Sequence, residues 1–341
     1  MQLLHKIIER ISPSAKRTQR WEIKYEIQVT SSESRVTSGT RESQDFKLII
    51  PNPRETRQQR IISAPIFSTE PTQMATESSH GNSFVSWDLT LAPGESKTIT
   101  QTFSIEKDFI HEEIPAHFTV ADYKSEEARK YLTPNNYIAG DNEQIKKIAR
   151  EITKGSISVK EIANLCNEYV IKTLSYGNPI PGLYKSTDII PSLSSSPSSA
   201  QVTSYDCGGY DTLLISLLNA SGVPARIVSG FWLSPNIGYK LKAKSSPQMH
   251  AWLAILLPDG KWIPADPSVE QLRRLGRSRK VGALGEVGSD RLVMSVGCDF
   301  DLQINNATIR TDILQTPIIH PKNSSISLSY SISASPLKAN S

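Results

Sequence analysis

The chain has 341 residues, of which 38% are hydrophobic and 21% are charged, a composition typical of globular proteins. At roughly 100–200 residues per domain, this length predicts two domains or one large one. The 38 Lys and Arg residues barely exceed the 34 Asp and Glu residues, so the net charge does not indicate nucleic-acid binding. Three cysteines are too few for a disulfide scaffold, but one of them could be a chemical reagent.

No segment of the sequence predicts a membrane span or a secretory signal. The longest apolar runs, such as Thr212–Leu218, are far shorter than the roughly 20 residues that cross a bilayer. In the N-terminal segment, residues 1–20, five apolar residues share one helical face: Leu3, Leu4, Ile7, Ile8 and Ile11. We expect a helix docked on the protein or, alternatively, an anchor on a membrane surface. We also expect a cytoplasmic protein, and the sequence does not indicate its oligomeric state.

Residues 21–120 have the pattern of a β-sandwich-like domain. From Trp21 onward, apolar residues alternate with polar ones, as in a half-buried strand. Further short strands are predicted over Phe46–Ile50, Ser83–Leu91 and Lys97–Phe103. The last two flank a tight turn, Ala92–Glu95, so we expect them to pair as a hairpin.

Residues 121–300 change to a helical period and are predicted to form an α+β catalytic domain. Asp141 and Ser158 are each followed three residues later by Gln or Glu, a pattern typical of helix starts. Two amphipathic helices are therefore predicted, the second ending near Leu174.

Two further segments are less regular. Gly177–Tyr205 is a long polar loop with six serines in Ser192–Ser199. Such loops are usually functional or disordered, so we expect either a mobile insertion or a wall of the substrate site. Residues 301–341 are predicted to form a C-terminal β extension and tail that could join either domain.

Cys207 is the candidate nucleophile. Apolar residues at helical spacing from Tyr210 to Leu218 predict a buried helix. Cys207 would then lie at the helix start, where unpaired amides and the helix dipole favour a negative charge and are expected to lower the pKa of the thiol. Cys166 is interpreted as a core residue, because it lies on the apolar face of its helix, and Cys298 is unassigned.

His250 and Asp266 lie on the two arms of a predicted hairpin with a turn at Pro258–Gly260. A two- or four-residue loop would place Asp266 opposite Leu253, on the face away from His250. A three-residue loop would place it opposite Trp252, with His250 as its diagonal neighbour, about 7–8 Å away between Cα atoms. We therefore predict an odd-length loop or a bulge.

Together these residues form a predicted Cys–His–Asp triad. The thiolate of Cys207 would attack a carbonyl carbon, His250 would accept the thiol proton and Asp266 would hold the imidazole in one tautomer. The N–H of Cys207 is one candidate donor to the oxyanion, and the side chain of Gln201 is a weaker second, because a Gln in a polar loop is usually only solvated. One Cys, one His and one Asp make an incomplete zinc site, so no metal is predicted.

These residues lie in segments that resemble the core of the transglutaminase-like superfamily. The segments are Asp206–Trp232, His250–Trp252 and Trp262–Pro267. The order Cys, His, Asp matches the family, as do the spacings of 43 and 16 residues. The resemblance extends over about Tyr123–Phe300, and the β region before it is similar to the β domain of many bacterial members.

The resemblance implies a papain-like α+β core, with helices packed on an antiparallel sheet, after an N-terminal β-sandwich-like domain. It implies Cys207 as nucleophile, His250 as base and Asp266 as its orienter, and a protein or peptide substrate without a cofactor. Two positions depart from the family: Tyr205 stands where Gly is frequent, and Asn219 where Arg is common.

Three functions remain open at this point. A cysteine hydrolase or protease-like enzyme would resolve its thioester with water, and a transglutaminase would resolve it with an amine. The sequence does not distinguish these two, because the acceptor depends on the shape of the pocket and its access to water. A third function is a non-catalytic interaction module that retains the fold.

Overall fold

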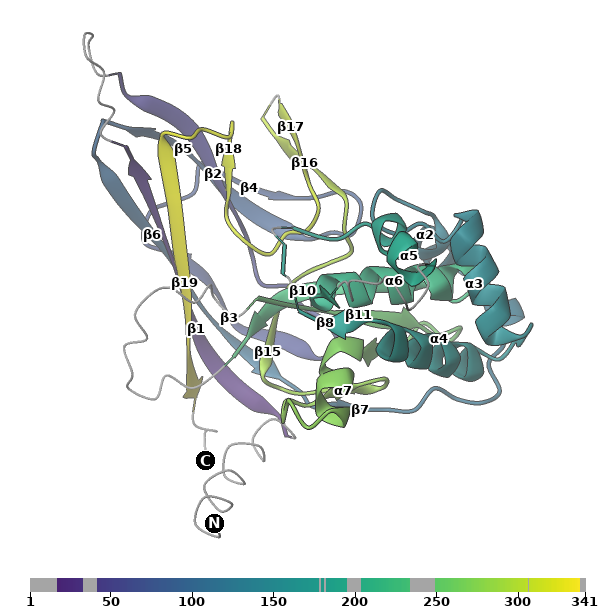
Figure 1. Cartoon of the computed structure of the whole chain (residues 1–341). Coiled ribbons are helices and arrows are strands. Elements are labelled where there is room, and N and C mark those ends of the chain that lie inside the picture. Colours follow the sequence, from purple (N-terminus) through teal and green to yellow (C-terminus); the bar gives the residue numbers. More distant parts are fainter. Residues whose placement is uncertain are drawn as a thin grey trace.

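The computed structural model describes residues 17–32, 42–177, 179–180, 182–194, 204–233, 249–305 and 307–337. In Figure 1 a strand-rich part lies on one side and the helices gather on the other. The predicted N-terminal helix, Gln201 and Ser195–Ser199 fall outside these ranges. The domain boundaries at residues 20, 120 and 300 stay a prediction.

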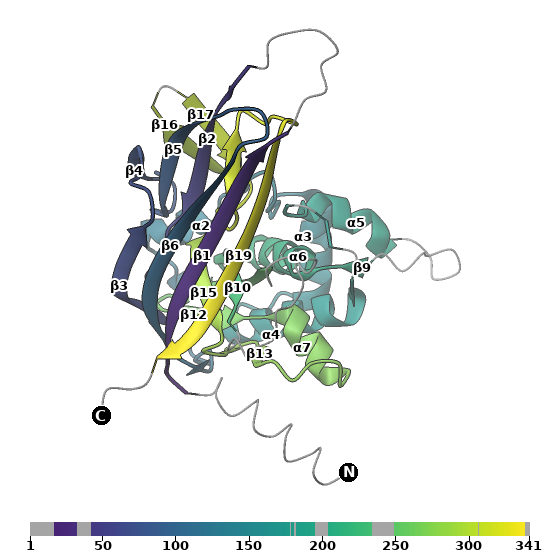
Figure 2. The same ribbon diagram turned by 90° about the vertical axis from the view of Figure 1, so that its left-hand side faces the viewer.

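Two four-stranded antiparallel sheets form the strand-rich part. The first has the order β19-β1-β6-β3 and the second β18-β2-β5-β4. The strands are β1 (Gln19–Ser31), β2 (Gln44–Pro51), β3 (Gln59–Phe67), β4 (Gln73–Thr76), β5 (Ser83–Leu91), β6 (Ser96–Lys107), β18 (Ile318–His320) and β19 (Ile326–Leu337). Figure 2 shows the first sheet face-on, with β1 between β6 and β19.

The core between these sheets follows from the alternation in β1. Its buried residues are Trp21, Ile23, Tyr25, Ile27 and Val29. They pack in one cluster with Leu48 of β2 and Trp87 of β5. Because side chains alternate across a strand, every second residue of β1 faces the opposite sheet. The predicted N-terminal β-sandwich is confirmed.

The predicted hairpin of Ser83–Leu91 with Lys97–Phe103 is wrong. β5 pairs with β2 and β4, whereas β6 pairs with β1 and β3. The turn between them does form, since Glu95 N–H donates to Ala92 C=O at 3.0 Å, but Gly94 N–H also donates to Ser31 C=O at the end of β1. The chain therefore crosses to the other sheet. An alternating strand suits a paired neighbour and a facing sheet equally well, so the pattern did not distinguish them.

The C-terminal strands join the sandwich. β19 pairs with β1 from Arg20 opposite Leu337 to Ser31 opposite Ile326. A small hairpin, β16 (Phe300–Ile304) with β17 (Ala307–Thr311), packs against the second sheet through Ile49 and Phe84. The sandwich is thus built from both ends of the chain.

The middle of the chain forms a third four-stranded antiparallel sheet, of order β12-β11-β10-β15, with helices on one face (Figure 1). Its strands are β10 (Ala225–Trp232), β11 (Met249–Leu256), β12 (Trp262–Ala265) and β15 (Arg291–Val296). The helices are α2 (Glu126–Leu132), α3 (Glu143–Thr153), α4 (Val159–Thr173), α5 (Ser186–Ser194), α6 (Cys207–Ala220) and α7 (Pro267–Arg274), with the short 3₁₀ helix η2 (Val120–Asp122). Short strands complete the unit: β7 (Ile110–His111), β8 (Ser175–Tyr176), β9 (Ser204–Tyr205), β13 (Gly282–Ala283) and β14 (Glu286–Val287). This is the predicted α+β core.

The central helix of this unit is α6. Its residues pack with α3, α4 and the inner residues of the sheet, including Ile227, Leu253 and Ile255. Within the described part of the chain, no helix has both the length and the apolar character to cross a membrane.

The first two predicted helices begin close to their expected positions. Asn142, rather than Asp141, caps α3, and its side chain accepts hydrogen bonds from the amides of Gln144 and Ile145 at 3.0 and 3.3 Å. Ser158 caps α4 as predicted. The loop predicted over Gly177–Tyr205 is wrong at Ser186–Ser194, which form helix α5. The sequence did not indicate this helix, because the buried pair Ile189 and Ile190 is followed by Pro and Ser and gives no helical period.

The sandwich and the α+β unit share a core. Phe231, Leu233, Leu292 and Met294, from the ends of β10 and β15, belong to the apolar cluster of the sandwich. Trp21 Nε1–H also donates to the backbone oxygen of Ser289 at 3.3 Å. The sandwich therefore supports the sheet that carries the candidate site.

Replacing Ile27 with Ala should lower the free energy of unfolding by about 2–5 kcal/mol, because a buried side chain leaves a cavity. Ile27 of β1 is 0% exposed. The matched control is Ile62→Ala in β3 of the same sheet, where the side chain is 50% exposed. Urea unfolding of both variants checks this, and an equal loss in both would contradict the described core.

Candidate active site

Helix α6 places Cys207 beside strand β11. Asp206 caps the helix, and its Oδ1 accepts a hydrogen bond from the amide of Gly208 at 2.9 Å. The Sγ of Cys207 lies 3.4 Å from the backbone nitrogen of Ala251, which donates to it. The predicted position of Cys207 at the helix start is confirmed, and the sulfur contacts the residue that directly follows His250.

The hairpin of β11 and β12 has the register predicted for a three-residue loop. Leu253 is opposite Ala265, and Leu257 N–H donates to Lys261 C=O at 2.8 Å across Pro258–Gly260. Gly260 has a φ of +87°, a left-handed conformation that glycine adopts without steric cost. This register brings the residue after Ala265 to the same face as His250.

That residue is Asp266, and each of its two carboxylate oxygens has two hydrogen-bonding partners. Oδ2 lies 2.7 Å from His250 Nε2 and 2.6 Å from Arg291 Nη2. Oδ1 accepts from the amide of Val269 and the hydroxyl of Ser268, both at 3.0 Å, and so caps helix α7. His250, Asp266 and Arg291 are 3%, 0% and 0% exposed. Buried charges need such partners, because water cannot solvate them.

The electrostatics of this group fix the protonation of the imidazole. Burial alone would raise the pKa of Asp266, but the charges of His250 and Arg291, with hydrogen bonds from His250 and Val269, lower it to about 2. Burial lowers the pKa of His250, and Asp266 opposes this in part. At neutral pH, Asp266 is therefore a carboxylate and His250 a neutral imidazole. Because a carboxylate only accepts, Nε2 carries the proton and Nδ1 is the basic nitrogen.

Arg291 was not predicted from the sequence. It opens strand β15, and its Nη2 also donates to the backbone oxygen of Val281 at 2.7 Å. Its guanidinium lies 4.4 Å from the ring centre of Trp232. Arg291 directly precedes the apolar run Leu292–Met294, which is an available signal for a buried charge, since Arg is almost never fully buried without a partner.

Two tryptophans fix the plane of the imidazole. The ring of Trp232, the last residue of β10, lies 4.3 Å from that of His250 at an angle of 24°. Trp252, two residues after His250, stacks at 5.9 Å and 21°. The sequence placed Trp252 on the face of His250, but it gave no indication of Trp232.

The expected lowering of the pKa of the Cys207 thiol is wrong. Burial raises this pKa well above its ordinary value, and the charges of Asp206 and Asp211 raise it further, while the amide of Ala251 opposes them. The field of one helix start is smaller than these effects. The resting thiol is therefore neutral at physiological pH.

Asp206 and Asp211 lie on either side of Cys207 in sequence. Burial raises the pKa of Asp206 to about 6, although amides of Gly208 and Gly209 oppose it. Asp211 is 0% exposed, and neither carboxyl oxygen has a hydrogen-bond partner among the described residues. Burial raises its pKa well above the ordinary value.

The two departures from the family pattern have local explanations. Tyr205 packs over Gly209, where a Cβ atom would lie 2.7 Å from the Cβ of Tyr205. Asn219 Nδ2 donates to the backbone oxygen of Tyr131 at 2.8 Å, at the far end of α6. Gln201 lies outside the described residues, so its role stays a prediction.

The other two cysteines are buried. Cys166 lies in the helical core, as predicted, and Cys298 lies beside Asn135. Burial raises the pKa of each thiol to about 12. Across the described ranges, no group of three or more His, Cys, Asp or Glu side chains is arranged to hold a metal ion.

Replacing Asp206 with Asn should accelerate alkylation of Cys207 by iodoacetamide at pH 7–8. Asn still caps the helix, while removal of the negative charge lowers the pKa of the thiol. The difference should vanish at pH 5, where wild-type Asp206, with a pKa of about 6, is itself neutral. Mass spectrometry of the labelled peptide measures the rate. Asp141→Asn, at an exposed site, is the control, and an unchanged or slower rate in Asp206→Asn at pH 8 would refute this electrostatic account.

One solved structure has a similar fold over nearly the whole chain. The structure is similar to that of a putative cysteine protease from Cytophaga hutchinsonii, with a TM-score of 0.59 and 15% identity over 95% of this chain and 92% of that chain. It has weaker likenesses to the periplasmic domain of TgpA from Pseudomonas aeruginosa (TM-score 0.37, 12% identity, 80% and 94% covered) and to red sea bream transglutaminase (TM-score 0.34, 11% identity, 88% and 61% covered).

By sequence, no curated protein matches the chain. A family model does match residues 146–267, a range that contains Cys207, His250 and Asp266. Over this segment the resemblance is confirmed: it is similar to the Transglutaminase-like superfamily.

Proposed function

We propose that the protein is a cysteine-dependent enzyme that cleaves or transfers acyl groups at peptide or side-chain amide bonds. The observation that carries this proposal is the buried His250–Asp266 pair at 2.7 Å, on a strand whose next residue contacts the Cys207 sulfur at 3.4 Å. A nucleophile, a base and an orienting carboxylate are the groups that such chemistry needs. The match of residues 146–267 to the family model supports the same proposal.

The first half-reaction forms a thioester. His250 Nδ1 takes the proton of the Cys207 thiol as sulfur attacks the carbonyl carbon, and the backbone N–H of Cys207 stabilises the oxyanion. When the intermediate collapses, the C–N bond breaks and the imidazolium gives its proton to the departing amine. Asp266 stabilises the imidazolium, and Trp232 and Trp252 hold the plane of the ring.

The second half-reaction regenerates the thiol. Water or a primary amine attacks the thioester and gives its proton to His250, and the sulfur leaves and recovers a proton from the imidazolium. Because the resting thiol is neutral, proton transfer to His250 accompanies attack in this scheme instead of preceding it. The rate then depends on the base more than on a pre-formed thiolate.

One observation favours the rival function, a non-catalytic interaction module. The raised pKa of Cys207 describes a thiol that is unreactive by itself, since the thiolate is the nucleophile. The two functions differ in whether His250 activates the sulfur.

Replacing His250 with Ala should slow alkylation of Cys207 at pH 7 by about 100-fold, the usual contribution of a general base. Cys166 and Cys298, whose pKa values are raised to about 12, should stay unlabelled in the same sample. The control is His111→Ala, since His111 is exposed on β7. Equal rates for Cys207 in wild type and His250→Ala would support the interaction module.

A glutamine-containing peptide should form a thioester at Cys207 and release ammonia. Mass spectrometry then separates the two activities: glutamate forms if water resolves the thioester, and an added primary amine is incorporated if transfer occurs. Cys207→Ala should abolish both products. A wild-type protein that modifies neither this peptide nor a peptide library, despite rapid alkylation, would contradict acyl chemistry on amides.

A further inference from the structure

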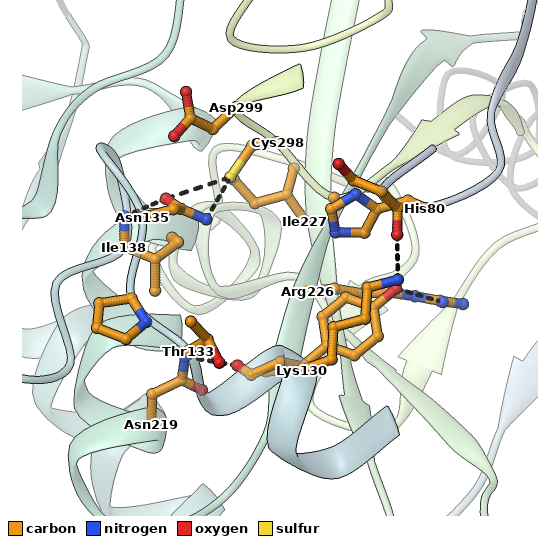
Figure 3. A pocket seen from close by; sticks show the side chains of 15 residues that line it. His80, Lys130, Thr133, Asn135, Ile138, Asn219, Arg226, Ile227, Cys298 and Asp299 are labelled. Atoms are coloured by element: carbon orange, nitrogen blue, oxygen red, sulfur yellow. Dashed lines mark hydrogen bonds between the residues drawn. The ribbon is translucent and has the colours of Figure 1, made fainter. Parts of the chain in front are cut away.

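A cavity lies at the end of α6 opposite Cys207. It has a volume of about 400 Å³ and is walled by the β4–β5 loop, helix α2 and the loop after it, the start of β10 and the turn before β16. Figure 3 shows His80, Lys130 and Arg226 on one side of it, and Asn135 and Cys298 on the other. At about 1.5 Å per residue, the 14-residue helix α6 separates it from Cys207 by roughly 20 Å. It lies where the sandwich meets the α+β unit, a usual place for a ligand site.

Positive charge converges on this cavity. Lys130 and Arg226 line it. Arg54 lies nearby: burial lowers the pKa of its guanidinium, and the charge of Arg226 lowers it further. Burial, together with the smaller effects of the charges of Lys130, Arg226 and Arg54, lowers the pKa of His80 to about 4. The positive charges of Lys130, Arg226 and Arg54 therefore all affect His80, which lines the cavity.

The nearby carboxylates of Asp299 and Glu77 already have hydrogen-bonding or ionic partners other than Lys130 and Arg226. Asp299, at the rim, pairs with Arg310 at 2.9 Å and accepts from Asn136 Nδ2 at 2.8 Å. Glu77 is 2% exposed and accepts hydrogen bonds from the amides of Ser79, His80 and Asn82. Neither carboxylate pairs with Lys130 or Arg226 within the described residues.

Polar atoms of the lining lack partners. Arg226 stacks on Trp262 at 3.7 Å and donates from Nη1 to Tyr131, but its buried Nε has no hydrogen-bond partner among the described residues. The same holds for the buried Nδ1 of His80 and Oδ1 of Asn219. Buried polar groups normally find a partner. Ile138 and Ile227 add apolar surface to the lining.

We propose that this cavity binds a small anion, a carboxylate or a phosphate, whose charged end contacts Lys130 and Arg226 and whose body lies against Ile138 and Ile227. A planar guanidinium held by stacking is well suited to either group. The site is independent of the chemistry proposed at Cys207.

Isothermal titration calorimetry on the full chain tests this with three probes: inorganic phosphate, succinate, and succinamide as the uncharged counterpart of succinate. We expect phosphate or succinate to bind with a Kd below about 1 mM, and succinamide not to bind. Lys130→Gln should weaken binding at least about 10-fold, because a hydrogen bond to a charged group is lost. Lys130 is exposed on α2, so this variant should fold.

The control is Arg129→Gln, which removes the same charge from the same helix outside the cavity. It should leave binding unchanged, and both variants should retain the wild-type alkylation rate at Cys207. The anion that binds more tightly identifies the ligand class. The proposal is overturned if neither anion binds, if succinamide binds as tightly as succinate, or if Arg129→Gln weakens binding as much as Lys130→Gln.

Discussion

One carboxylate holds the candidate site together. Asp266 ends strand β12, caps helix α7 through Oδ1, and joins His250 and Arg291 through Oδ2. Its charge is buried, and its pKa of about 2 shows that the surrounding donors outweigh the cost of burial. Asp266 directly follows strand β12, caps helix α7 and orients the imidazole of His250. The same hydrogen bonds therefore determine both the local fold and the geometry of the site. Removal of any one donor would leave a buried charge under-compensated.

The contact between His250 and Asp266 could be predicted because its determinants are local. Fifteen residues separate His250 from Asp266, and the register between them depends only on the length of the Pro258–Gly260 loop. Likewise, the helix that begins at Cys207 follows from the apolar period of Tyr210–Leu218. Both determinants can be counted along the chain without knowledge of the tertiary fold.

The rest depended on contacts between distant segments. Trp232 contacts His250 and Arg291 contacts Asp266 from two other strands of the sheet, and no local pattern joins them to the site. The pKa of Cys207 was misjudged for the same reason, since burial by the tertiary fold outweighs the helix start. The partner of β6 also depended on long-range packing, because an alternating strand suits either sheet of a sandwich. In each case the outcome depended on burial in the tertiary fold or on pairing with a distant strand, and neither can be read from a short stretch of sequence.

The contact between Tyr205 and Gly209 has an evolutionary consequence. With only 2.7 Å between the Cβ of Tyr205 and a Cβ built at position 209, the two positions share one volume on the first turn of α6. A side chain at 209 requires glycine at 205, because every other residue carries the Cβ that clashes, and Tyr at 205 requires glycine at 209. The two positions should therefore covary among related sequences, with glycine at one of them wherever the other carries a side chain.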